Sequence, residues 1–176
     1  MPNQANDSVS PEVRVQIARR LGREPRGLEG VAVYGADGAP IVIRVSSLVD
    51  EKPFPNLFWL IDPEIVYRID CDEAGGLIHR FQQQVDGDAG LQRQMIGDHR
   101  SHIELRNGYM TSVVEEQLRL ANYYEVLQQR GIGGIADFGR IRCLHTWYAA
   151  HLLVPNTIGR LLDQHWADNE SQSSSA

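Results

Sequence analysis

The sequence predicts an α+β fold with an N-terminal helix, a small, mainly antiparallel three-stranded sheet, and then a cluster of four to six helices. Two observations lead to this prediction. The β-rich runs are confined to residues 31–61, and helix-start signals of the form cap, proline, acid stand before and after that region. A group of strands followed by a group of helices is typical of α+β domains, and 176 residues suffice to bury one core.

The two ends of the chain differ from its middle in composition. Residues 1–9 are mostly polar, and the last residues form the low-complexity run ESQSSSA. Such segments have too few apolar side chains to offset the entropy that ordering removes. We therefore expect disordered tails at residues 1–9 and 168–176, on either side of a single α+β domain of residues 10–167.

The N-terminal helix is predicted to run from Ser10 to Leu21. Ser10 is a preferred N-cap residue, and Pro11 stands at the first helical position, where no intrahelical hydrogen bond needs its N–H. Apolar residues then recur at every fourth position, which gives the helix one buried face. Gly22 can adopt the left-handed conformation that commonly ends a helix.

Three strands are expected next. Residues 31–34 and 41–45 are rich in β-branched side chains, and Asp37-Gly38 between them is a typical hairpin turn. Residues 57–61 are continuously apolar, as expected of a strand that is buried on both faces. The segment EKPFPN before this run is predicted to be a loop, because its two prolines interrupt any ladder of hydrogen bonds.

The rest of the chain predicts helices. Asp62-Pro63-Glu64 repeats the helix-start signal, and Gly75-Gly76 ends the helix that it opens. The further helices are expected over residues 77–85, over 88–129 with an interruption near Asn107-Gly108, from about Gly139 or Arg140 to just before Pro155, and from a cap at Asn156 through Trp166.

Charge and composition exclude several classes of protein. The net charge of −6 argues against a general nucleic-acid binder, because phosphate neutralisation needs a basic surface. Cys71 and Cys143 lie far apart and do not form the disulfide framework of a small secreted protein. The N-terminus lacks the layout of a signal peptide, and no apolar run approaches the roughly 20 residues of a membrane span. We expect a cytoplasmic protein without a resident cofactor.

The stretch RCLHTWYAAH, residues 142–151, concentrates the chemistry of the chain in one apolar segment. On a helix that starts near Arg140, Cys143 shares a face with Trp147, whereas His145 lies on the other side. An undistorted helix would therefore not bring thiol and imidazole to one ion, and we expect neither zinc nor iron here. The favoured interpretation is a buried core helix in which Cys143 is shielded and reacts more slowly than Cys71.

A second interpretation of this stretch remains open. With the helix starting near Arg140, Cys143 lies in its first turn, where the helix dipole favours a thiolate. The glycine-rich turn upstream would let backbone N–H groups approach an anion. The candidate catalytic residues are Cys143, His145 and Asp62, and the candidate ligand-binding residues are Gly133, Gly134, Arg140 and Arg142. Asp62 follows a buried strand, but its place before Pro63 already explains it as a helix cap.

His99 and His102 offer a weaker alternative for a metal. Histidines three apart on a helix can bind one ion, but the sequence shows neither a third ligand nor an orienting partner. We expect these two side chains to serve packing instead.

Several segments together resemble a known family. They are RLGREPRGLEGVAV, PFPNLFWLIDP, GIGGI and IRCLHTWYAAHLL, within residues 19–158. These segments are similar to the bacterial domain-of-unknown-function family 501, for which the resemblance implies no activity. Members are encoded near a septum-formation initiator and an exopolyphosphatase, which implies a link to cell division or phosphate metabolism.

The same resemblance bears on metal binding. Actinobacterial members carry cysteines in the hairpin and at the strand-to-helix junction, which implies a metal site together with the helical cysteine and histidine. The matching segments here, VYGADGAP and LIDPE, contain no cysteine. The prediction of a site without metal is strengthened accordingly.

The sequence thus favours a cytosolic bacterial accessory protein that binds a protein partner. The alternative is an enzyme or anion-binding protein that uses Arg142, Cys143 and His145 at the glycine-rich helix start. Exposure distinguishes them: a sealed Cys143 excludes the enzyme, whereas Cys143 and His145 together at an accessible place favour it.

Overall fold

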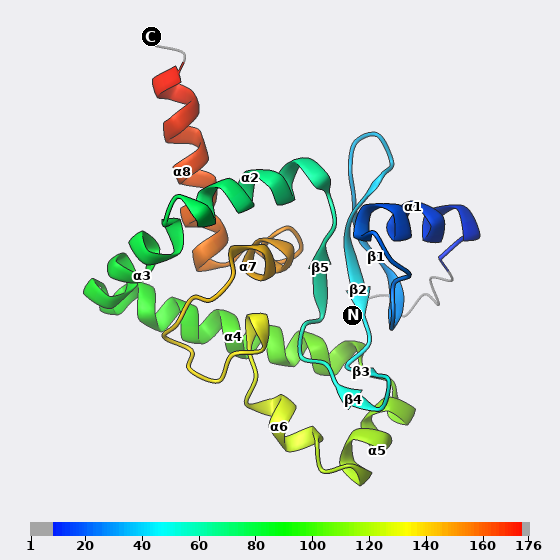
Figure 1. The fold of residues 1–176 in the computed structure, drawn as a ribbon. Coiled ribbons are helices and arrows are strands. Elements are labelled where there is room, and N and C mark those ends of the chain that lie inside the picture. The colour runs from blue at the N-terminus through cyan, green and yellow to red at the C-terminus, as the bar shows by residue number, and fades with distance from the viewer. Residues whose placement is uncertain (1–8, 174–176) are drawn as a thin grey trace.

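The computed structural model describes residues 9–173, and the order of its elements confirms the predicted α+β class (Figure 1). The helices and strands are α1 (Pro11–Leu21), β1 (Leu28–Tyr34), β2 (Pro40–Val45), β3 (Leu48–Val49), β4 (Lys52–Pro53), β5 (Phe58–Leu60), α2 (Pro63–Ala74), α3 (Leu77–Gly87), α4 (Ala89–Tyr109), α5 (Ser112–Leu120), α6 (Tyr124–Gln128), η1 (Ile132–Gly134), α7 (Leu144–His151) and α8 (Thr157–Ser173). The described residues hold seven α-helices after the sheet, because the stretch predicted at 88–129 divides into α4, α5 and α6.

The three-stranded sheet is antiparallel, as the sequence predicts, and its strand order is β1-β2-β5. The β1–β2 hairpin turns between Tyr34 and Pro40, which are paired in register, and β5 pairs with β2 through Val42 and Leu60. A second ribbon of β3 and β4 occupies part of the predicted loop. Pro53 does not prevent this pairing, because the hydrogen bond that links the two strands at this end is donated by the next residue: Phe54 N donates to Ser47 O at 2.7 Å.

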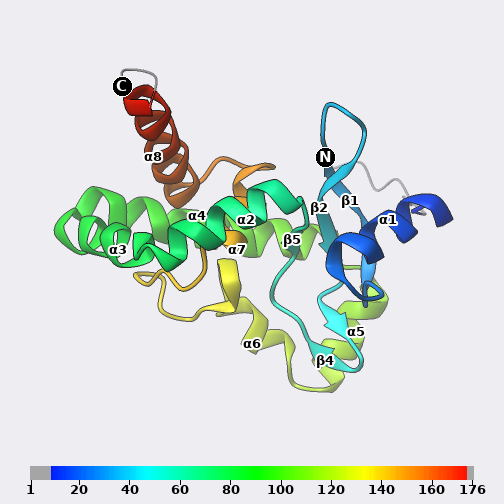
Figure 2. The same cartoon turned by 45° about the horizontal axis from the view of Figure 1, so that its top comes forward.

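Strand β2 is buried on both faces, so that two apolar clusters form on opposite sides of the sheet. Val42 belongs to the larger cluster with α2, α3, α4, α7 and α8, whereas Ile43 and Val45 pack with Ile17 of α1 in the smaller one. Figures 1 and 2 show α1 on one side of the sheet and the helical layer on the other. Alternation along a strand sends successive side chains to opposite faces.

Helix α7 lies inside the helical layer and packs on β5, α8 and α2. Trp147 is only 1% exposed, so the prediction that this helix is central is confirmed. Its predicted start near Gly139 or Arg140 is wrong, because α7 begins at Leu144. The backbone before it is tied to α3 instead: Ile141 N donates to Gln82 Oε1 and Gln82 Nε2 donates to Gly139 O, both at 2.9 Å.

Helix boundaries elsewhere follow their caps. Asp62 accepts from Glu64 N and Ile65 N at the start of α2, as predicted. The long helix α4 ends at Tyr109 rather than near Asn107, because Thr111 supplies the cap that opens α5.

The C-terminal prediction needs a correction. Helix α8 continues to Ser173, past the tail predicted from residue 168. This extension is held to α2 through Glu170, whose Oε1 lies 2.9 Å from Arg68 Nη2. Residues 1–8 and 174–176 lie outside the described part, so the predicted N-terminal tail is described only at Val9. The boundaries of a single domain stay a prediction.

None of the helices in the described part of the chain combines the length and the apolar character that crossing a bilayer requires.

Candidate functional site

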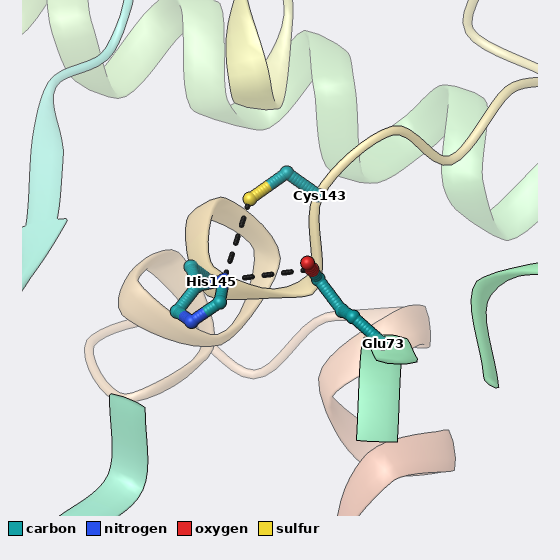
Figure 3. A group of neighbouring side chains, drawn as sticks. All are labelled: Glu73, Cys143 and His145. Carbon is teal, nitrogen blue, oxygen red and sulfur yellow. Dashed lines mark hydrogen bonds and ion pairs between the residues drawn. The ribbon is translucent and has the colours of Figure 1, made fainter. Parts of the chain in front are cut away.

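Cys143 is the N-cap residue of α7 and has an extended backbone, with φ −150° and ψ 119°. His145 follows two residues later in the first helical turn. This change of backbone conformation brings Cys143 Sγ within 3.6 Å of His145 Nδ1 (Figure 3). The prediction that a helix separates thiol from imidazole is therefore wrong, because only one of the two residues is helical.

Helix α2 supplies the acidic side of the site. Glu73 Oε1 lies 3.5 Å from His145 Nδ1 and also accepts a hydrogen bond of 2.6 Å from Leu144 N. On the opposite edge of the ring, His145 Nε2 lies 3.2 Å from Asp70 Oδ1 and 3.3 Å from Val66 O. Three acceptors on one helix thus surround both nitrogens of this imidazole, together with the sulfur.

The surroundings of His145 favour its protonated form. The hydrogen bond to the Cys143 sulfur raises the pKa of His145 to about 9, with further support from Glu73 and the Val66 carbonyl and against an opposing effect of partial burial. The His145 and Glu73 side chains remain 22% and 25% exposed, and Cys143 is half-buried. The site is therefore accessible from solvent.

Glu73, Cys143 and His145 form what we call the Cys–His–Glu cluster. Each offers one ligand atom, and these atoms all lie within 4.8 Å of one another. Within residues 9–173 no other group of three histidine, cysteine or acidic side chains converges in this way. The cluster could hold a single cation.

Two glycines predicted as ligand-binding residues position the start of α7. Gly133 and Gly134 have φ of +71° and +69°, where side chains are strained. A Cβ on Gly133 would lie 2.9 Å from Thr146 Oγ1, and the Thr146 hydroxyl in turn donates to Cys143 O at 2.9 Å. The glycine turn therefore packs directly against the residue that anchors Cys143.

The two predicted arginines are exposed and do not belong to the cluster. Arg140 faces Asp86 at 3.5 Å and Asp137 at 3.9 Å. Arg142 is exposed, and no carboxylate of the described residues lies within ion-pair distance of it. Arg142 therefore retains a positive charge beside the site.

Asp62 is not brought to the cluster. Besides capping α2, it accepts from Arg20 Nη1 at 3.2 Å, which ties α1 to the start of α2. These contacts give Asp62 a structural role.

His99 is buried by aromatic packing. Its ring stacks on Phe138 with centroids 4.5 Å apart and meets the edge of Trp147 at 4.8 Å. Nδ1 accepts from Ile132 N at 3.0 Å, while Nε2 has no partner among the described residues. Burial lowers the pKa of His99 to about 4.

His102 is buried beside Phe58 and also has an unpartnered Nε2 within the described part of the chain. Burial, followed by the charges of Arg106 and His99, lowers its pKa to about 3. Among the described residues, no cysteine or acidic side chain joins either histidine in a group of three potential ligands, as a metal site would require.

Arg106 is a buried cation that sequence reasoning missed. It is 0% exposed, and its guanidinium donates to three backbone carbonyls, those of Pro55 (3.1 Å), Arg130 (2.8 Å) and Leu127. Burial lowers its pKa to about 10. It holds the end of α6 against α4, where a cation also complements the helix dipole.

The acidic side chains of α2 at this site, Glu73 of the cluster and Asp70 beside it, were also missed. A signal for it existed, because these residues are spaced by three on a helix and hence share one face. What the sequence did not reveal is that this face meets the start of a helix about seventy residues further on.

A scan against family models matches residues 31–164 to the family described as "Protein of unknown function (DUF501)". The chain belongs to this family. The match includes every residue of the Cys–His–Glu cluster, as well as Asp70. No curated protein and no solved structure shows a significant match to this DUF501 protein.

Proposed function

We propose that this DUF501 protein is a hydrolytic enzyme whose active site is the Cys–His–Glu cluster. The observation that supports the proposal most directly is the 3.6 Å contact between Cys143 Sγ and His145 Nδ1, on an imidazole whose other nitrogen is held by Asp70. A protonated imidazole held in this way can donate its proton to the leaving group while the neighbouring sulfur attacks an ester or phosphoester, and can take a proton back from water in the following hydrolytic step.

Accessibility also supports an active site over a purely structural cluster. A sealed Cys143 would have excluded an enzyme, whereas this side chain is half-buried and its neighbour His145 retains 22% exposure. Arg142, exposed next to Cys143 in the chain, adds a positive charge that suits an anionic substrate.

Hydrolysis of p-nitrophenyl acetate and p-nitrophenyl phosphate by the full chain tests this proposal. Cys143→Ala and His145→Ala are each expected to lower the rate by at least about 100-fold, the scale of a lost acid–base or nucleophilic group. Cys71→Ala, which removes the exposed thiol of α2, is the matched control and should retain the rate. Equal rates in the wild type and all three variants would contradict the proposal.

A second candidate is a cytosolic accessory protein that binds a protein partner, linked to cell division or phosphate metabolism as the resemblance implies. Exposed apolar side chains on α5 and α6 support it: Val113 is 62%, Leu120 78% and Val126 44% exposed. Capture of one partner by the wild type and its loss in Leu120→Glu, checked by mass spectrometry, would favour this function. Recovery of the same proteins with both would speak against it.

A further inference from the structure

We propose that the Cys–His–Glu cluster binds one divalent zinc-type ion through Cys143 Sγ, His145 Nδ1 and the Glu73 carboxylate, with a fourth position open to solvent. This inference deepens the proposed hydrolytic function and rests on it, since a bound ion would supply the nucleophilic water. It assigns Cys143 the role of ligand.

The spacing of the ligand atoms fits tetrahedral coordination. With Zn–S near 2.3 Å and Zn–N or Zn–O near 2.0 Å, tetrahedral angles place nitrogen about 3.5 Å from sulfur and about 3.3 Å from oxygen. The corresponding distances from His145 Nδ1 are 3.6 Å to Cys143 Sγ and 3.5 Å to Glu73 Oε1. The sulfur and the carboxylate oxygen lie within 4.8 Å of each other and would have to approach to about 3.5 Å to complete the triangle. Figure 3 shows the three side chains pointing toward one place.

The far side of the imidazole provides an independent argument. His145 Nε2 faces two acceptors, Asp70 Oδ1 at 3.2 Å and Val66 O at 3.3 Å, so its proton is held on that nitrogen. A cation that displaces the Nδ1 proton then finds the lone pair of Nδ1 turned toward the thiol and the Glu73 carboxylate, while the Nε2 proton stays in place. A histidine ligand whose second nitrogen donates to a carboxylate or carbonyl is the usual arrangement around zinc.

The donor set selects the kind of ion. One sulfur, one imidazole nitrogen and one carboxylate oxygen suit zinc and related transition metals, whereas magnesium and calcium prefer oxygen ligands throughout. A divalent cation would also offset the negative charge that a thiolate and a carboxylate bring together when both coordinate it.

The number of ligands points to a reactive rather than a structural ion. Structural zinc sites are closed by four protein ligands, whereas catalytic sites have three and leave one position for water. The cluster supplies three ligands, and the partial exposure of His145 and Glu73 leaves solvent access to the fourth position. Zinc lowers the pKa of a bound water to about 7, which makes hydroxide available at neutral pH.

The experiment uses the full chain, freed of metal by a chelator and then dialysed. It is titrated with ZnCl₂ in a calorimeter and with CoCl₂ in a spectrophotometer. We expect one ion per chain in each case, with the strong visible absorption of tetrahedral cobalt and a near-ultraviolet band from sulfur to cobalt.

Variants locate the ion. Cys143→Ser should remove the sulfur-to-cobalt band, and His145→Ala and Glu73→Gln should each weaken zinc binding by more than about 100-fold, beyond the loss typical of outer-shell partners. Glu73→Gln keeps an oxygen that can accept from Leu144 N, so the start of α7 is preserved. Cys71→Ser and His79→Ala, which remove an exposed thiol and an exposed imidazole outside the cluster, are the controls and should bind as the wild type does. Circular dichroism checks that every variant is folded.

Absence of binding in the wild type, or a sulfur-to-cobalt band that depends on Cys71 rather than Cys143, would overturn the metal site. If zinc does not bind but Cys143→Ala and His145→Ala still abolish ester hydrolysis, the metal inference alone is wrong and Cys143 is the nucleophile. If zinc binds at the cluster and the loaded protein hydrolyses neither ester, the proposed enzymatic function is wrong while the site stands.

Discussion

Two groups of histidines in this protein have opposite electrostatic environments. His145, between α2 and α7, is surrounded by a sulfur, a backbone carbonyl and two carboxylates, and its pKa is raised to about 9. His99 and His102 on α4 are surrounded by aromatic rings and a buried arginine, and their pKa values are lowered to about 4 and 3.

The difference shows that neighbouring groups, more than the residue type or its local sequence, decide what a histidine can do. Each of these histidines lies in a helix. Without acceptors, burial disfavours the charged imidazolium and leaves a packing element. With acceptors on both nitrogens, the same side chain becomes a group that holds a cation, whether a proton or a metal ion.

The largest effect is expected where the buried histidines pack. Trp147→Ala should lower the free energy of unfolding by roughly 3–5 kcal/mol, because it leaves a cavity beside His99 in the centre of the larger core. Urea denaturation measures this change. Leu120→Ala, on the exposed face of α5, should stay within about 0.5 kcal/mol of the wild type. A loss at Trp147 no larger than that of the control would contradict the central position of α7.

Acid should destabilise the protein through His99 and His102. In the unfolded chain these histidines are protonated below about pH 6.5, whereas in the folded protein their pKa values are lowered to about 4 and 3. Between these pH values the unfolded state therefore binds more protons than the folded state. The stabilisation is therefore fully present above pH 6.5 and is lost as the pH falls, by roughly 2 kcal/mol per histidine at pH 5.

His102→Leu isolates this acid effect, since its Nε2 has no hydrogen-bond partner among the described residues to lose. The loss of unfolding free energy between pH 7.5 and pH 5 should be smaller in the variant than in the wild type, by roughly the 2 kcal/mol that one histidine contributes. Carboxylates affect both proteins alike. An unchanged difference would show that His102 does not titrate in this range.

A smaller effect, on zinc affinity, is expected from Asp70, the carboxylate that faces His145 Nε2. Asp70→Asn should weaken zinc binding by about 10–100-fold, because Asp70 orients the imidazole without contacting the ion. Asp72→Asn is not a suitable control, since Asp72 accepts from Trp166 Nε1. Glu64→Gln, in the first turn of the same helix, is a better one and should bind zinc normally. Equal affinities in both variants would exclude Asp70 as the orienting group.

The smallest effect concerns the two thiols. Cys71 is exposed and Cys143 half-buried, so iodoacetamide at neutral pH should label Cys71 first, as the sequence predicts. A chelator should accelerate labelling of Cys143 and leave Cys71 unaffected, because only Cys143 is a proposed ligand. Peptide mass spectrometry follows both sites. Labelling of Cys143 that is faster than Cys71 in the presence of zinc would argue against ligation.

Much of the fold could be read from local signals. Ser10, Asp62 and Gly22 cap helices in the structure as their residue types predict, because a side-chain oxygen or a left-handed glycine acts within a few residues. The hairpin around Asp37-Gly38 and the burial of Trp147 followed in the same way from turn chemistry and apolar pattern.

The candidate site depended on contacts that no local pattern contains. Cys143 lies just outside the helix, in a segment held by tertiary contacts: Gln82 of α3 binds the backbone of Gly139 and Ile141, and Glu73 of α2 accepts from Leu144 N. A helical Cys143 would place its thiol on a different face from the imidazole of His145. Because Cys143 is extended instead, the two groups lie 3.6 Å apart. Sequence by itself therefore determined the fold class and most helix caps, whereas the tertiary structure alone brought Asp70 and Glu73 of α2 to the start of α7. Caps and turns act over a few residues, but the electrostatic environment of a side chain is set by whatever the folded chain packs against it.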